Sequence, residues 1–232
     1  MRTELARGDS GLTWEPIGLD DKLRVILEGV KSAEVETPKQ NTRTLRKTKR
    51  WREQLTDVIE SLIRIGNDLA PKLENELGIP LKANELLRVA MFQPSTKNLF
   101  SELEIHFSSS DRGPLDRQDY TVLGSLNEMA KSLALVGDAA ISMAVLHHIW
   151  QPKATDVGTL TQRRSDLVSN EHLAGVCDDW GLYEHRIHFD PVEPSKSEIE
   201  HDKGTLVEAI YGIVYIGHGF QRVKDLVPKL IQ

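Results

Sequence analysis

Two acids stand alone in otherwise apolar stretches of this chain. Asp138 is the only charged residue of the stretch 132–146, and Glu208 is the only one of 204–217. An ionised carboxylate that is removed from water is costly unless a cation or good hydrogen bonds compensate for the lost hydration. Two such acids on separate helices could converge on one divalent cation, and carboxylate oxygens suit Mg²⁺ or Mn²⁺. The pair therefore predicts a metal-dependent hydrolase.

Other interpretations of the acidic residues stay open at the level of sequence. Each acid could be a buried structural carboxylate paired with Arg163 or Arg164 or with helix amides. The dipeptide His201–Asp202 is similar to the metal-binding pair of HD-type phosphohydrolases. That class needs a further histidine upstream and an aspartate well downstream, and only Asp225 lies beyond the pair. Asp202 could instead add a carboxylate to the first site from the preceding turn, although a charge that favours a helix N-terminus is the simpler interpretation.

A run of cations without an acid occupies residues 38–52, PKQNTRTLRKTKRWR. Its basic residues are Lys39, Arg43, Arg46, Lys47, Lys49, Arg50 and Arg52. On a chain with a formal net charge of −6, such a block could neutralise several RNA phosphates, with Trp51 available to stack or pack. The alternative is a solvated linker and first helical turn.

Composition limits the class and the location of the protein. The 232 residues are enough for one domain with an appendage, or for two small domains. Cys177 is the only cysteine, which excludes an internal disulfide framework and a multi-cysteine zinc site. We find neither an apolar signal core nor a window of roughly 20 apolar residues. We therefore expect an intracellular protein without a membrane partner, in the cytoplasm or in an organelle.

Helical spacing recurs along the chain and strand signals are scarce, so we expect an all-α fold. Residues 31–44 resemble a linker, and 108–119 a surface loop. Candidate caps are Asp20 or Asp21, Asn84, Asp156 or Thr159, and Ser169 or Asn170; Pro152 is expected to end the central helix. The expected helices lie near residues 20–30, 44–77 (in two pieces), 84–93, 122–150, 156–168, 170–180, 202–216 and 218–230.

Four segments carry a family resemblance in a fixed order. They are LENELGIPLKANELLRVAMFQPS at 73–95, LALVGDAAI at 133–141, GTLTQRRSDLVSNEHLAGVCDDWGL at 158–182 and KGTLVEAIYGIVYIGHGF at 203–220. Together they resemble the endonuclease domain of the ribonuclease III family, in which the second and fourth segments supply catalytic acids. Gln93 stands where that family usually has a histidine. The resemblance implies an all-helical ribonuclease III domain over residues 71–232, preceded by a helical extension over 1–70.

Two departures from the bacterial pattern lie beside the acids. The usual tetrad has a further glutamate and aspartate where this chain has Ala134 and Thr205. The Mini-III branch of the family is similar to this chain at those places, keeps a working aspartate and glutamate, and lacks a double-stranded RNA-binding domain. The likeness implies that Asp138 and Glu208 are the catalytic residues and metal ligands.

The resemblance also implies substrates and partners. We expect a homodimer that uses Mg²⁺ or Mn²⁺ to cleave double-stranded or structured RNA, with ribosomal RNA maturation as a candidate process. The products would carry a 5′-phosphate and a 3′-hydroxyl. The alternative is a catalytically inactive relative that binds RNA or scaffolds a ribonucleoprotein.

Overall fold

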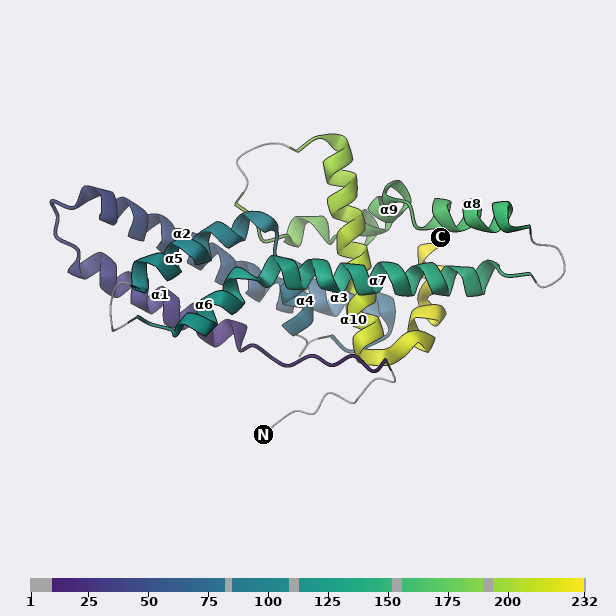
Figure 1. The fold of residues 1–232 in the computed structure, drawn as a ribbon, viewed down its shortest axis with the longest axis horizontal. Coiled ribbons are helices and arrows are strands. Elements are labelled where there is room, and N and C mark those ends of the chain that lie inside the picture. The colour runs from purple at the N-terminus through teal and green to yellow at the C-terminus, as the bar shows by residue number, and fades with distance from the viewer. Residues whose placement is uncertain (1–9, 82–84, 109–112, 152–155, 190–193, 232) are drawn as a thin grey trace.

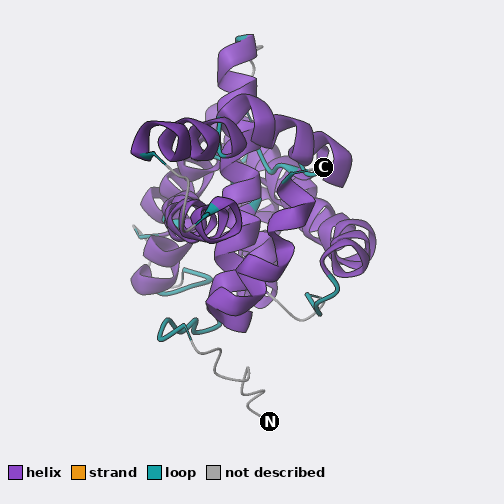
Figure 2. Cartoon of the chain, turned by 90° about the vertical axis from the view of Figure 1, so that its right-hand side faces the viewer, coloured by secondary structure: helices purple, strands orange, loops and turns teal. Residues whose placement is uncertain are grey.

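The structure is a computed structural model that describes residues 10–81, 85–108, 113–151, 156–189 and 194–231. The described chain is built of helices and loops (Figure 2), and one isolated β-bridge joins Phe92 to Ile187. The all-α prediction is confirmed. The α-helices are α1 (Leu19–Glu36), α2 (Thr42–Arg64), α3 (Ala70–Leu77), α4 (Glu85–Ala90), α5 (Lys97–Phe107), α6 (Arg117–Gly124), α7 (Leu126–Ile149), α8 (Val157–Leu167), α9 (Asn170–Trp180) and α10 (Lys196–Leu230).

Helices α1 and α2 form a hairpin at one end of the molecule (Figure 1). The predicted linker over 31–44 is wrong, because α1 continues to Glu36 and α2 begins at Thr42. Residues 31–36 contain good helix formers, and the Asn41 side chain caps α2 by accepting a hydrogen bond from the Thr44 N–H. The connection between the two helices is therefore a short turn.

The first turn of α1 is capped from outside its own sequence. Gly18, in the left-handed region at φ 69°, is the N-cap residue, and neither expected aspartate caps the helix. The Glu85 carboxylate on α4 instead accepts the Ile17 and Leu19 amides at 2.8 and 2.7 Å. The aspartates lie in the first turn, where the helix dipole favours negative charge.

Helix α2 leads without a break into α3. A π-helical turn, η1 (Ile65–Leu69), joins them, and the Ala70 N–H bonds to the Ile65 carbonyl five residues earlier. Pro71 follows and has no N–H to donate, and α3 ends at Gly78, where φ is 62°. The predicted boundary between residues 70 and 71 thus falls inside a continuous helical run. Side chains from both sides of it belong to one hydrophobic core.

Helices α7 and α10 form the centre of the molecule, and Figure 1 shows α10 crossing α7. Helix α10 begins earlier than predicted, because Ser195 and Glu198 form a reciprocal capping box. Gly219, at φ 77°, breaks its helical geometry and separates the two final helices that the sequence predicts. Helix α7 is shorter than the predicted central helix, since α6 precedes it as a separate element.

The short helices agree with the predicted caps where these are described. Asp156 caps α8, Ser169 caps α9, and α9 ends at Gly181 in the left-handed region. The expected cap at Asn84 and the expected stop at Pro152 lie outside the described residues. Helix α5, which the sequence patterns above do not include, buries Leu99, Phe100, Leu103 and Phe107.

Within the described residues, one helix is long and apolar enough to cross a membrane. It is α7, and 44% of its most apolar window is buried inside the protein. The expectation that no such window exists is therefore wrong. The central helix of a folded domain can be as long and as apolar as a membrane-spanning helix, because its side chains form the core. Helix α7 packs against α10 in this way.

Candidate active site

The two isolated acids are brought together where α7 crosses α10. A Cβ atom at Gly137 would lie 1.7 Å from the backbone oxygen of Glu208, and one at Gly212 would lie 2.1 Å from the backbone oxygen of Leu133. Glycine is therefore required at both positions, and the two helix backbones are in contact. Asp138 follows the first glycine directly, and Glu208 lies one turn before the second. The crossing thus fixes both carboxylates at one point of the fold.

Both acids line a single pocket of about 490 Å³. Helix α7 contributes Asn127 and Lys131 to its wall, and α10 contributes His201 and Asp202. The segment from Phe92 to Pro94, between α4 and α5, closes a further side and includes Gln93. The pocket therefore lies between the N-terminal arms of the two crossing helices.

The two carboxylates interact electrostatically. Burial and, secondarily, the negative charge of Asp138 raise the pKa of the Glu208 carboxyl to about 7. Glu208 is partly buried, whereas Asp138 is exposed. Among the described residues neither acid has an ion pair, and Arg164 instead lies 3.4 Å from the Ser142 hydroxyl. The predicted alternative of an acid paired with Arg163 or Arg164 is not what the structure shows.

The positions of the two missing family acids face the same pocket. Ala134 lies one turn before Asp138, and Thr205 lies three residues before Glu208; both line the pocket. They supply a methyl group and a hydroxyl group in place of carboxylates. Within the described chain, no group of three or more His, Cys, Asp or Glu side chains could hold a metal ion. The site consists of one acid pair.

Two further candidates line the pocket without completing a three-ligand site. The Asp202 carboxylate lies 3.7 Å from the Arg186 guanidinium, so part of its charge is already compensated. His201 is exposed, and its Nδ1 lies 3.4 Å from the Asn170 amide nitrogen. The HD-type arrangement, which needs further ligands around this pair, is not formed in the described part of the chain.

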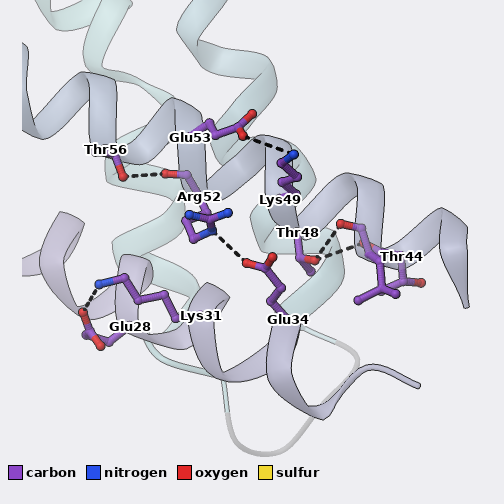
Figure 3. A network of polar contacts seen from close by, with 10 residues as sticks. Glu28, Lys31, Glu34, Thr44, Thr48, Lys49, Arg52, Glu53 and Thr56 are labelled. Carbon is purple, nitrogen blue, oxygen red and sulfur yellow. Dashed lines mark hydrogen bonds and ion pairs between the residues drawn. The ribbon is translucent and has the colours of Figure 1, made fainter. Parts of the chain in front are cut away.

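The predicted RNA-binding residues lie outside the pocket, on the α1–α2 connection and on α2. Figure 3 shows part of their surroundings. Lys49 lies 3.9 Å from Glu53 and Arg52 lies 2.8 Å from Glu34, while Arg50 pairs with Glu102 on α5. Lys39, Arg43, Arg46 and Lys47 are exposed. Trp51 is only 2% exposed and donates to Glu102 at 2.9 Å, so it packs in the core.

Sequence patterns alone do not single out some residues that build the site. Gly212 and Lys131 are examples: the first makes the helix crossing possible, and the second brings a cation to the pocket wall. A glycine in each of two long apolar helices, near an isolated acid, is the signal that could have indicated a close crossing.

Comparison with known proteins finds a family match that covers the region of this site. The family model described as the ribonuclease III domain matches residues 131–219, a range that holds both acids and both glycines of the crossing. Ribonuclease 3 of Azobacteroides pseudotrichonymphae is 26% identical over 147 residues, which cover 63% of this chain and 51% of that protein. Ribonuclease 3 of Flavobacterium psychrophilum is 31% identical over 101 residues, which cover 43% of this chain and 39% of that protein. No solved structure matches the chain.

These matches indicate a class of protein. The ribonuclease III domain model matches a region that covers less than half of the chain, and the chain is similar in sequence to two ribonuclease 3 proteins. It spans about half the length, or less, of the curated relatives it matches. The likeness to the Mini-III branch stays a prediction.

Proposed function

We propose that this chain is an endoribonuclease that hydrolyses phosphodiester bonds in double-stranded or structured RNA, with a divalent cation held by Asp138 and Glu208. One observation carries the proposal: both acids of a ribonuclease III domain line one pocket and, among the described residues, have no ion pair there. Such a partly buried pair of like charges is unfavourable by itself and becomes favourable with a cation.

The donor set fits Mg²⁺ or Mn²⁺. Both ions prefer oxygen ligands, and Mg²⁺ usually keeps several waters and binds through one or two carboxylates plus substrate phosphate. When bound, the ion would lower the pKa of a water molecule and offset negative charge on the departing oxygen. Asp138 and Glu208 would hold the ion, and the Thr205 hydroxyl can donate to or accept from a water in the same pocket.

Cleavage of duplex RNA by the purified full chain with Mg²⁺ tests the function. We expect cleavage by the wild type, with 5′-phosphate ends, and loss of cleavage in Asp138→Asn and Glu208→Gln. The matched controls Glu171→Gln and Asp179→Asn change exposed acids of α9 and should cleave normally. A wild type that binds duplex RNA but never cuts it would refute catalysis.

That outcome defines the second candidate function, a noncatalytic relative that binds RNA or scaffolds a ribonucleoprotein. It is favoured by one observation, the absence of carboxylates at Ala134 and Thr205 on the pocket wall. For the leading proposal, ribosomal RNA precursors are a candidate source of structured substrate.

A second copy of this chain is the proposed protein partner. Large apolar side chains are exposed on α7 at Leu135 (71%) and Met143 (52%), and directly after its end at Trp150 (61%). The spacing of eight residues places Leu135 and Met143 on the same side of the helix, and Trp150 follows at its end. Leu135 also lines the pocket, so a partner on this face would reach the site. Exposed apolar surface of this kind is typical of an interface.

The molar mass in solution tests this interface. We expect a dimer for the wild type by light scattering, and a monomer for Met143→Glu. Val35→Glu, at an exposed apolar residue of α1, should stay dimeric. A monomeric wild type at high concentration would contradict the proposed partner.

A further inference from the structure

The cations of the basic run, residues 38–52, fall into two groups according to whether they form ion pairs within the protein. Within the described residues, Lys49, Arg50 and Arg52 each form an ion pair with a carboxylate of this chain. No such ion pair involves the other four, Lys39, Arg43, Arg46 and Lys47, and they are exposed. Carboxylates of the fold thus hold the three paired cations, and within the described residues no carboxylate holds the other four.

The free cations are carried on a rigid support. Thr48, Trp51 and Leu55 bury the inner face of α2, and the Trp51 ring lies 5.1 Å from the His106 ring of α5. Arg43 and Arg46 are three residues apart, which places them on one face of the helix. The start of α2 is therefore fixed against the end of α5, with its cations directed to solvent.

Lys47 extends this surface onto α5. Its Nζ lies 6.0 Å from the centre of the Trp51 ring. Its charge also acts on His106, whose pKa is lowered by burial and then by Lys47. The cations of α2 thus border the C-terminal end of α5, in agreement with the neighbouring positions of the two helices in Figure 1.

Helix α5 connects that surface to the pocket. It begins just after Pro94, which lines the pocket, and it ends beside Trp51. Eleven residues at about 1.5 Å each give a length of roughly 16 Å. The exposed face of α5 starts with Lys97 and Asn98. Its two acids are paired, Glu102 with Arg50 and Glu104 with Arg117 at 3.7 Å.

Cations also lie at the pocket end of this path. The pKa of Glu128 is lowered first by a hydrogen bond and charge from Lys131, and more weakly by the charge of Lys97. Both lysines therefore lie near the Glu128 carboxylate. Lys131 is on the pocket wall, and Lys97 is the first residue of α5. Cations therefore lie at both ends of α5, with Lys97 and Lys131 toward the pocket and the first turns of α2 at the other end.

We propose that the cations at the two ends of α5, Lys97 at one end and Lys47, Arg46 and Arg43 at the other, bind the phosphate backbone of the RNA duplex beyond the cleaved bond. The inference rests on the proposed function, because the pocket fixes where the duplex begins. Cations on a rigid surface suit a regular polyanion, and double-stranded RNA is recognised mainly through its shape and backbone. The α1–α2 hairpin lies outside the matched ribonuclease III domain and serves as a substrate-binding arm.

Duplex affinity measured against salt concentration tests the arm. The variant Arg43→Gln/Arg46→Gln/Lys47→Gln is made in the Glu208→Gln background, so that RNA is bound without cleavage. The slope of log affinity against log salt should fall by about 2 to 3, since each phosphate contact in a duplex contributes about 0.9. Lys97→Gln alone should lower the slope by about 1.

A matched variant removes the same charge elsewhere. Arg163→Gln/Lys196→Gln/Lys224→Gln changes cations of α8 and α10 that do not lie along α5. Its slope should equal that of the parent, and thermal melting should show that all variants are folded. Equal slopes for the α2 triple variant and the parent, or equal losses in the two triple variants, would overturn the inference.

The result separates this inference from the proposed function. If the slope of log affinity against log salt falls in the α2 triple variant and the wild type cannot cleave RNA, the binding arm is supported and catalysis is refuted. Normal cleavage by the wild type with an unchanged slope would refute the arm alone. A wild type with no affinity for duplex RNA would refute both.

Discussion

At the scale of single residues, the chemistry depends on the ionisation of Glu208. Its pKa is raised to about 7 from an ordinary value of 4.5, because burial and the nearby Asp138 both disfavour the charged form. Below about pH 7, the fold therefore favours the protonated acid when no cation is bound. Divalent-cation binding needs the charged form, so cation affinity should rise with pH up to about 7.

The same pKa shift predicts how metal-free stability changes with pH. A group with a raised folded pKa contributes stability below its unfolded pKa, and that contribution is lost as pH rises through the folded value. The melting temperature of the wild type minus that of Glu208→Gln should therefore fall between about pH 4.5 and pH 7. Paired melting curves across this range measure it.

Two observations check this interpretation. Adding Mg²⁺ above pH 7 should raise the wild-type melting temperature and leave Glu208→Gln nearly unchanged, because an ion that binds only the folded state stabilises it. Glu171→Gln, at an exposed acid of α9, should show none of this pH dependence. A difference between wild type and Glu208→Gln that is constant with pH would contradict the shifted pKa.

The sequence predicts the identity of both acids, because an isolated charge in an apolar helix is visible without coordinates. It does not predict that Arg163 and Arg164 leave the pair uncompensated. Nor does it predict that Trp51 is buried rather than available for stacking. Both outcomes depend on contacts between residues far apart in the chain, such as Trp51 with Glu102.

At the scale of elements, the glycine crossing of α7 and α10 decides whether the acids meet. Gly137→Ala would place a Cβ atom 1.7 Å from a backbone oxygen of Glu208, so the helices must separate. Overpacking usually costs about 1–3 kcal/mol of unfolding free energy, and we expect at least about 2 here, with loss of cleavage. Denaturant unfolding and the RNA assay measure the two effects.

Gly175→Ala is the matched control for that substitution. Gly175 lies in α9, and a Cβ atom there would meet nothing within 4 Å. The change should be neutral or slightly stabilising, since alanine favours a helix by up to about 1 kcal/mol over glycine. If Gly137→Ala were as stable and active as Gly175→Ala, the close crossing would be wrong.

Helix positions follow from the sequence where local signals are strong. Asp156, Ser169 and Gly181 mark helix ends through short-range capping. Two helix ends do not follow as directly. Helix α1 continues to Glu36 through residues predicted to form a linker, and α10 begins early because of a capping box within a polar stretch.

At the scale of the whole molecule, the N-terminal hairpin and the region matched by the ribonuclease III domain model share one core. Leu55 of α2 is fully buried in the same cluster as side chains of α7 and α10. Leu55→Ala should lower unfolding free energy by about 2–5 kcal/mol and shift a single thermal transition. Ile63→Ala, at a half-exposed residue of the same helix, should have little effect.

Calorimetry distinguishes a shared core from two independent units. Two transitions, of which Leu55→Ala shifts only one, would show that the predicted boundary at residue 71 separates units that unfold independently. A single transition would explain why charge substitutions, rather than removal of the hairpin, are the suitable test of the binding arm.

The most direct test of the central claim is a double-mutant cycle on the rate of duplex RNA cleavage with Mg²⁺ under single-turnover conditions. If Asp138 and Glu208 hold one ion, each of Asp138→Asn and Glu208→Gln should abolish cleavage nearly completely, and the double variant should be no worse, because residues that act as a unit are strongly non-additive. Cleavage that survives in either single variant, or losses that simply add, would contradict the account of a shared metal site at the crossing of α7 and α10.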